Sequence, residues 1–205
     1  MVNTETPRFE FRSFAQNFGI VEQKIRMLSA VENIRESAEI YILSAKNDTH
    51  NIKIRNDVLD IKVLMQKKKG LEQWQPFMKQ EFPISAELIT EKILPVYHVQ
   101  HFRLKLKNYS IRQWLDDVVT PHPELISVHV SKLRFAFSID NCIAEIAEVL
   151  INGAFIKTVA VESTDIDEIL RVKKLVNLNE YENINYLLAL KRITGLAPLP
   201  NSHDF

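Results

Sequence analysis

The sequence predicts an α+β protein built from roughly seven or eight strands and four or five helices. Several segments of the 205-residue chain alternate apolar and charged residues, which is the pattern of a strand with one apolar face. Turn-forming pairs such as Asp140-Asn141 and Asn152-Gly153 separate these segments and predict hairpins. Other segments place apolar residues at the spacing of an amphipathic helix. The pattern therefore favours antiparallel strands with flanking helices.

The N-terminal part is expected to consist mainly of strands. An alternating strand opens it over Arg8–Phe14, and a helix follows over Asn17–Leu28 with Asn17 as its N-cap. Asn56-Asp57 is the expected turn of a hairpin, and a run of lysines before Gly70 closes the second strand of that hairpin. The further strands expected here are Ile34–Leu43, Asn51–Arg55, Val58–Met65 and Leu71–Glu81.

Two helices are expected in the middle of the chain. The first covers Ile84–Leu94, with Ser85 as its cap and Pro95 as its end, and the second covers Asn108–Val119. This helical segment, about 84–121, separates two groups of strands. Neither group is expected to bury a core of its own, so one domain over residues 1–205 is expected.

The C-terminal part is expected to form a three-stranded meander followed by two helices. The meander begins with the long strand Leu125–Ser138 and ends near Ser163. The next helix covers Asp165–Val176, and Ser163 or Thr164 is its expected cap. The last helix covers Asn183–Thr194 and is stopped by a glycine and the proline-bearing tail.

The composition excludes several classes of function. Lysine plus arginine and aspartate plus glutamate each number 26, and zero net charge argues against bulk binding of nucleic acids or membranes. The single cysteine, Cys142, allows no intramolecular disulfide and fits a reducing, cytoplasmic setting. With 4 glycines the chain has no glycine-rich phosphate loop and no dinucleotide-binding fingerprint. No apolar run of the sequence is long enough to span a bilayer.

Most of the expected strands carry long charged side chains on one face. An open sheet would turn these side chains into solvent, whereas a closed or nearly closed barrel would line a polar tunnel with them. The second arrangement is costly unless a ligand or a counter-charge satisfies it, and it would suit a polyanion that enters with a divalent metal. The charged faces hold Glu10 and Arg12; Glu39; Lys53 and Arg55; Asp60 and Lys62; Lys132 and Arg134; Glu145; and Glu162.

The order of these motifs resembles the CYTH domain of the triphosphate tunnel metalloenzymes over most of the chain. Arg8-Phe-Glu10-Phe-Arg12 is similar to the family's opening Glu-x-Glu-x-Lys strand. The resemblance implies an eight-stranded antiparallel β-barrel that holds a triphosphate together with Mg²⁺ or Mn²⁺. The other matching positions are Glu39-Ile-Tyr41, Lys53-Ile-Arg55, Lys62, Lys132, Arg134, Glu145, Ala160-Val-Glu162 and Asn183-Ile-Asn-Tyr186.

The resemblance also implies site roles. In the family's chemistry the metal polarises the terminal phosphate and a water attacks it. Glu10, Glu145 and Glu162 would then hold the metal or orient the water as the catalytic residues. The phosphate chain of the substrate would be neutralised by Arg12, Lys53, Arg55, Lys62, Lys132 and Arg134. The chain departs from the pattern at Arg8, Ala147 and Ala160, where the family usually has acids.

Three functions therefore stay open at this point. The first is metal-dependent hydrolysis of inorganic triphosphate or an organic triphosphate, and the second is a protein of the same fold that binds a phosphate polyanion without catalysis. The third is an interaction module whose charges lie on an outer sheet face. Inward orientation of the charges separates the first two from the third. The sequence also leaves a homodimer open.

Overall fold

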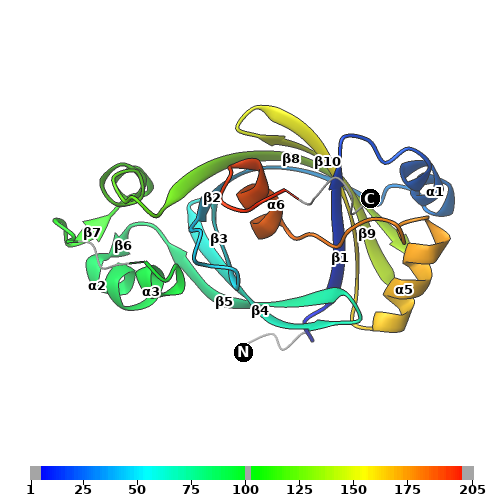
Figure 1. The fold of residues 1–205 in the computed structure, drawn as a ribbon, viewed down its shortest axis with the longest axis horizontal. Coiled ribbons are helices and arrows are strands. Elements are labelled where there is room, and N and C mark those ends of the chain that lie inside the picture. Colours follow the sequence, from blue (N-terminus) through cyan, green and yellow to red (C-terminus); the bar gives the residue numbers. More distant parts are fainter. Residues whose placement is uncertain (1–5, 100–102, 200–205) are drawn as a thin grey trace. The chain divides into compact units, whose positions relative to one another are not determined.

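The computed structural model (Figure 1) describes residues 6–99 and 103–199. Eight strands form a closed antiparallel barrel in the order β1-β10-β9-β8-β2-β3-β4-β5, with flanking helices. The predicted α+β class and the eight-stranded barrel are therefore confirmed. The barrel strands are β1 (Phe9–Ala15), β2 (Asn33–Leu43), β3 (His50–Arg55), β4 (Val58–Lys68), β5 (Leu71–Glu81), β8 (Ile126–Ile139), β9 (Cys142–Ile151) and β10 (Ala154–Ser163).

The chain divides into two compact units, each with its own hydrophobic core. Unit 1 comprises Met1–Ala38, Leu64–Gln75 and Val130–Asn185. Unit 2 comprises Glu39–Val63, Pro76–His129 and Tyr186–Phe205. Several barrel strands contribute residues to both units. The chain forms two compact units, so a single domain over residues 1–205 stays a prediction.

In unit 1, apolar strand faces pack under two helices. Helix α1 (Ile20–Leu28) and helix α5 (Ile166–Leu175) bury one side each, and α5 lies on β1, β9 and β10 (Figure 1). Phe9 and Phe11 of β1 join this core and are almost fully buried. Asn152 and Gly153 have φ angles of 47° and 89°, so the left-handed turn expected between β9 and β10 is present.

In unit 2, the apolar faces of β3 and β4 pack against short helical segments. Asn56 and Asp57 both have positive φ and form the predicted hairpin turn. Ile52 and Ile54 of β3 and Leu59 of β4 lie in the core. Two short strands, β6 (Ile84–Ser85) and β7 (Asn108–Tyr109), pair with each other. The helices are α2 (Ala86–Leu88), α3 (Leu94–Val96), α4 (Ile111–Trp114) and α6 (Tyr186–Ile193), with π-helical turns η1 (Ile89–Ile93) and η2 (Leu115–Val119).

Two predictions about helix ends in the middle of the chain were wrong. Pro95 does not end the first helix, because the π-helical turn before it carries the helical run on to Val96. The second helix does not begin at Asn108, which pairs as a strand with Ser85. It begins after Ser110, which forms a capping box with Gln113. Ser85 caps α2 as predicted, by accepting a hydrogen bond from the backbone N–H of Leu88.

Three predictions about the other helix starts were also wrong. Helix α1 begins at Ile20 after Gly19, and the Asn17 side chain instead accepts a hydrogen bond from the Gly19 N–H. Helix α5 is capped by Asp165, whose Oδ1 accepts from two backbone N–H groups of the first turn. Helix α6 begins at Tyr186, because the preceding residues bind the edge of β1.

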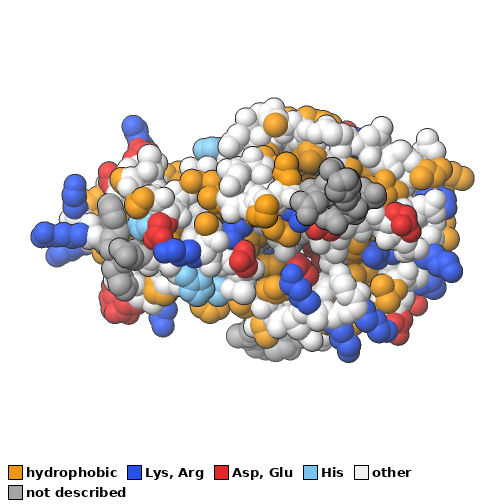
Figure 2. Space-filling model, in the orientation of Figure 1, with side chains coloured by type: hydrophobic (Ala, Val, Ile, Leu, Met, Phe, Trp, Pro, Cys, Tyr) orange, Lys and Arg blue, Asp and Glu red, His pale blue; other side chains and the backbone are white. Residues whose placement is uncertain are grey.

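The surface carries charges of both signs. On the described part of the face drawn in Figure 2, acidic and basic side chains are interspersed with apolar ones, as zero net charge leads one to expect. Among the described residues, no helix is long and apolar enough to cross a membrane.

Candidate functional site

Alternation along β1 separates its apolar and charged side chains. Phe9 and Phe11 face the core under the helices, so Glu10 and Arg12 project to the opposite, inner side of the barrel strands. In register, Glu10 lies opposite Glu162 on β10. Ala160, the next inward position of β10, lies opposite Arg12 on one side and Glu145 of β9 on the other. The inward orientation of charge is therefore present in unit 1.

Arg12 is held by three carboxylates from three strands. Its Nε donates to Glu10 Oε1 at 2.8 Å, and its Nη1 donates to Glu145 Oε1 at 3.0 Å. Its Nη2 lies 3.9 Å from Glu162 Oε1, and Nη1 also lies 3.4 Å from the hydroxyl of Thr158. The Arg12 residue is only 5% exposed. The three predicted catalytic acids therefore converge, and they converge on a guanidinium.

Glu162 is the carboxyl of this cluster with a clearly altered acidity. Burial first, and the neighbouring charge of Glu10 second, raise the pKa of Glu162 from its ordinary value of 4.5 to about 8. Arg12 acts in the opposite direction, because a nearby cation favours the ionised carboxylate. Burial and Glu10 therefore favour the protonated form of Glu162, whereas Arg12 favours the ionised form.

A fourth carboxylate adjoins the cluster, and the sequence did not single it out. Glu72 of β5 lies directly opposite Glu10 of β1 and is 6% exposed. Its Oε2 accepts hydrogen bonds from Trp74 Nε1 at 3.1 Å and from Asn185 Nδ2 at 2.8 Å. Lys67 reaches its other oxygen at 2.9 Å. In the sequence, the one sign of this role was an acidic residue inside the expected strand Leu71–Glu81. That strand showed no alternating charged face that would have linked Glu72 to the other acids.

The basic residues of β8 lie beyond this acidic cluster in the register. Arg134 pairs with Ala147 of β9, and Ala147 pairs in turn with Thr158 of β10. Lys132 lies two residues further from the acidic cluster along β8 and is 5% exposed. Arg134 donates one hydrogen bond to Ser37 at 3.2 Å, but its Nε is buried and has no hydrogen-bond partner among the described residues.

Unit 2 has an inner-face charge cluster of its own around Glu39. Tyr41 donates to Glu39 at 2.9 Å, while Lys53 and Arg55 each approach it at 3.4 Å. Glu39 is almost fully buried. Its ion pair with Arg55 is a pairing with a neighbouring arginine. Burial lowers the pKa of Lys53, and the charge of Glu39 partly opposes that effect. Lys62, a further predicted phosphate-binding residue, lies on β4 with its side chain exposed.

The chain was compared with known proteins by sequence and by structure, and only the structures gave matches. No protein-family model and no curated protein sequence matches the chain. Among solved structures, a candidate adenylyl cyclase from Hippeastrum, described as revealing a dominant triphosphatase activity, matches with a TM-score of 0.51 and 12% identity. The match covers 94% of this chain and 98% of that one. The protein PH1012 from Pyrococcus horikoshii matches with a TM-score of 0.51 and 14% identity, over 89% and 98% of the two chains.

The protein has the CYTH, or triphosphate tunnel, fold. At these identities the likeness concerns the fold alone. Both charge clusters described above lie on strands of the closed barrel, and their central residues Arg12 and Glu39 are buried. An interaction module with these charges in bulk solvent is therefore excluded for Arg12, Lys132 and Glu39, which are all nearly buried.

The acidic cluster of this triphosphate tunnel fold does not have the geometry of a metal centre. Mg²⁺ and Mn²⁺ need several oxygen ligands arranged around one point. Here the guanidinium of Arg12 occupies that point and takes up oxygens of Glu10 and Glu145. Within residues 6–99 and 103–199, no group of three metal-ligating side chains is arranged to hold an ion. The predicted metal-binding role of these acids is therefore not supported by their arrangement.

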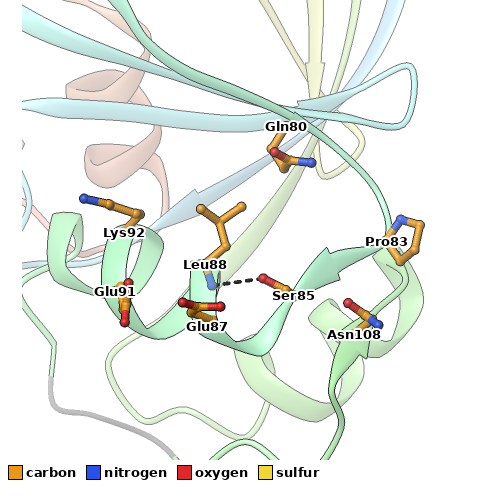
Figure 3. Close-up of a pocket in the computed structure, with 8 residues that line it drawn as sticks. All are labelled: Gln80, Pro83, Ser85, Glu87, Leu88, Glu91, Lys92 and Asn108. Carbon is orange, nitrogen blue, oxygen red and sulfur yellow. Dashed lines mark hydrogen bonds between the residues drawn. The ribbon is translucent and has the colours of Figure 1, made fainter.

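A pocket on unit 2 is lined by none of the predicted site residues. It has a volume of about 380 Å³ and is formed by the end of β5, β6, β7 and the helical run that follows β6 (Figure 3). Its lining side chains include Gln80, Glu87, Glu91, Lys92 and Asn108. None of the residues predicted to bind phosphate or metal lines this pocket.

Proposed function

We propose that the protein binds a triphosphate-type small anion, inorganic or organic, on the inner face of unit 1. The observation that carries the proposal is the buried Nε of Arg134, which has no hydrogen-bond partner among the described residues. An unpaired buried donor costs roughly 1–3 kcal/mol or more, and phosphate oxygens are the acceptors that a guanidinium prefers. Lys132, two residues along the same strand face, adds a second cation.

Arg12 makes this binding compatible with the nearby acids. Glu10, Glu145 and Glu162 would repel an incoming polyanion if their charges were not compensated. Arg12 neutralises part of that charge from within the protein, and the raised pKa of Glu162 removes more of it near neutral pH. A resident divalent ion is therefore not required for the anion to bind.

The residues beside Arg134 in the register are small and carry no charge. Ala147 of β9 pairs with Arg134 on one side and with Thr158 on the other. Ala136, two residues after Arg134 on β8, pairs with Glu145 of β9. These alanines stand where larger side chains would fill the inner face. They support a ligand position between the basic and acidic parts of unit 1.

Hydrolysis of the bound triphosphate is the second candidate. It is favoured by the convergence of Glu10, Glu145 and Glu162 from three strands within 4 Å of one guanidinium. The Hippeastrum protein of the same fold, described as having a dominant triphosphatase activity, also favours it. The predicted Mg²⁺ or Mn²⁺ requirement, the cytoplasmic location and the homodimer stay predictions, and so do the phosphate-binding roles of Lys53, Arg55 and Lys62.

Calorimetric titration with inorganic tripolyphosphate in the presence of a chelator tests the proposal. We expect the wild-type protein to bind, and Arg134→Met to weaken binding at least tenfold, which corresponds to about 1.4 kcal/mol. Arg112→Met is the matched control, because Arg112 is exposed and its ion pair among the described residues is with Asp116 on the same helical segment. The absence of wild-type binding, or equal affinities of both variants, would overturn the proposal.

A phosphate-release assay separates binding from hydrolysis. Tripolyphosphate and ATP are incubated with the protein and Mg²⁺, Mn²⁺ or chelator. Binding without release supports the proposal as stated. Metal-dependent release that Glu162→Gln abolishes would replace it with the second candidate, and the acidic cluster would then have to rearrange around the ion.

A further inference from the structure

Strands β1 and β5 pair over a short length only. The rest of the β1 edge on this side, from Phe11 onward, has no described partner on β5 and is called the seam. Among the described residues, these strands pair at two positions, Phe9 with Gln73 and Glu10 with Glu72. Past Glu10, the edge of β1 is bound instead by the segment 183–185, which precedes α6. The backbone N–H of Ile184 donates to the carbonyl of Arg12 at 2.7 Å. The segment therefore takes the place of a strand next to Arg12.

Asn183 completes the contacts of the Arg12 backbone. Its Oδ1 accepts the backbone N–H of Arg12 at 2.9 Å, so both backbone polar groups of Arg12 are bound by this segment. Its Nδ2 donates to the carbonyl of Gly70 at 2.6 Å, in the turn between β4 and β5. One amide side chain thus links the strand that carries Arg12 to the turn that precedes Glu72.

Asn185 binds the carboxylate on the other side of the seam. Its Nδ2 donates to Glu72 Oε2 at 2.8 Å, and Glu72 lies opposite Glu10. The two asparagines therefore contact the two neighbours of Glu10, namely Arg12 and Glu72.

The residue between the two asparagines is Ile184, which is 7% exposed and faces the core from this segment. The amides of Asn183 and Asn185 are therefore left to contact β1, Gly70 and Glu72. An asparagine suits both positions, because its side chain carries an acceptor and two donors on a short stem.

We infer that Asn183 and Asn185 are positioning residues of the proposed anion site, with Asn183 fixing the strand that carries Arg12 and Asn185 fixing the carboxylate of Glu72. This inference rests on the proposed function. Neither asparagine is placed in contact with the ligand. They act through Arg12 and Glu72, whose positions set the charge that an entering anion meets.

The physical reason lies in the backbone contacts of Arg12 on this side of β1. If the Asn183 acceptor is removed, the backbone N–H of Arg12 loses its partner and the strand edge relaxes. The guanidinium then fits its three carboxylates less well, because Nε and Nη1 bind two different strands at 2.8 and 3.0 Å. Acidic charge that Arg12 had compensated would then oppose the anion.

The test measures the dissociation constant for tripolyphosphate, with chelator and with Mg²⁺, for wild type and four variants. We expect Asn183→Ala to weaken binding about tenfold in chelator. We expect Asn183→Gln to stay within about threefold of wild type, because it keeps an acceptor for the Arg12 N–H and a donor for Gly70 without adding charge. Asn185→Ala is expected to weaken binding about fivefold. Asn179→Ala, an exposed asparagine in the same connection, is the control and should bind as wild type does.

The response to Mg²⁺ distinguishes positioning from general support of the fold. If Arg12 is displaced in Asn183→Ala, the carboxylates are free to attract a divalent ion, and Mg²⁺ should recover part of the lost affinity. Wild type should show no such gain. A uniform loss in both conditions, with a lower melting temperature, would overturn the positioning role.

Each remaining outcome bears either on the proposed function or on the role of the two asparagines. If wild type fails to bind tripolyphosphate, the proposed function fails and the inference fails with it. If wild type binds and Asn183→Ala and Asn185→Ala bind equally well, the inference alone is overturned. Equal losses in Asn183→Ala and Asn183→Gln would show that the amide contacts of Asn183 do not carry the effect. Should Asn183→Ala fail to fold, Asn185→Ala and its rescue by Asn185→Gln provide the test.

Discussion

Arg12 determines the charge balance on the inner face of unit 1. Its guanidinium meets carboxylates from β1, β9 and β10, and its side chain is only 7% exposed. Removing the cation of such a cluster costs more than the net worth of the cluster, because the partly buried carboxylates of Glu10, Glu145 and Glu162 are left to repel one another. The free energy of unfolding should therefore depend strongly on this residue.

Replacing Arg12 by methionine should lower the free energy of unfolding by about 3 kcal/mol at pH 9, where Glu162 is ionised. The methionine keeps much of the volume but leaves Glu10, Glu145 and Glu162 without their shared cation. Urea unfolding followed by circular dichroism measures the change. Arg112→Met is the control and should alter the free energy by less than about 0.5 kcal/mol. Equal stabilities of the two variants would show that the cluster is not held by Arg12.

Glu162 should make stability depend on pH in a predictable direction. Its pKa is raised from 4.5 to about 8 in the folded protein, mainly by burial, so the folded state binds more protons than the unfolded state between these values. The contribution of Glu162 to stability is therefore present at low pH and is lost as the pH rises toward 8. Urea unfolding between pH 5 and pH 9 should show this decline, and Glu162→Gln should flatten it. A decline of the same size in Glu162→Gln would assign the effect to another group.

At the scale of single elements, short polar side chains decide where helices begin. The sequence predicted Ser163 or Thr164 as the cap of α5, but Ser163 instead donates to the carbonyl of Asn141 and accepts the N–H of Asp165. Asp165 accepts from Asp167 at 2.8 Å and from Glu168 at 3.5 Å. Three polar residues in a row are all competent caps, so only the path of the chain selects one of them.

Asp165→Ala should therefore lower the free energy of unfolding by about 1 kcal/mol, the usual cost of losing an N-cap. Thr164→Ala is the matched comparison and should have little effect, because Thr164 does not cap the helix. Chemical unfolding at neutral pH measures both changes. The reverse ranking of the two variants would mean that α5 begins one residue earlier than in this structure.

At the scale of the whole molecule, ligand and chelator should act differently on stability. A ligand that binds only the folded state stabilises it by about 2.7 kcal/mol at one hundred times its dissociation constant. Tripolyphosphate should therefore raise the melting temperature. A chelator alone should leave it unchanged, because Arg12 and not a metal ion compensates the acidic cluster. Differential scanning fluorimetry tests both, and a fall in melting temperature with chelator would indicate a resident ion.

Much of the barrel could be predicted from local patterns. Alternation at period two located most of the barrel strands to within a few residues, and Leu71–Glu81 was expected as a further extended segment. The hairpin turns were also predictable, because Asn56-Asp57 and Asn152-Gly153 readily take positive φ. Helix boundaries were less predictable, because π-helical turns and competing caps depend on contacts outside the helix.

Apart from Glu72, the residues on the charged strand faces followed from the sequence alone, since the side-chain period of a strand is fixed by its backbone. Only the tertiary structure decided which charges meet. Glu10, Glu145 and Glu162 were expected to share a metal ion, yet they surround Arg12, two residues from Glu10 on the same face. Glu72 joined them through the β1–β5 register, and the segment 183–185 binds the backbone of Arg12 instead of forming the start of a helix. Contacts between distant strands depend on register and closure, and no local pattern encodes these.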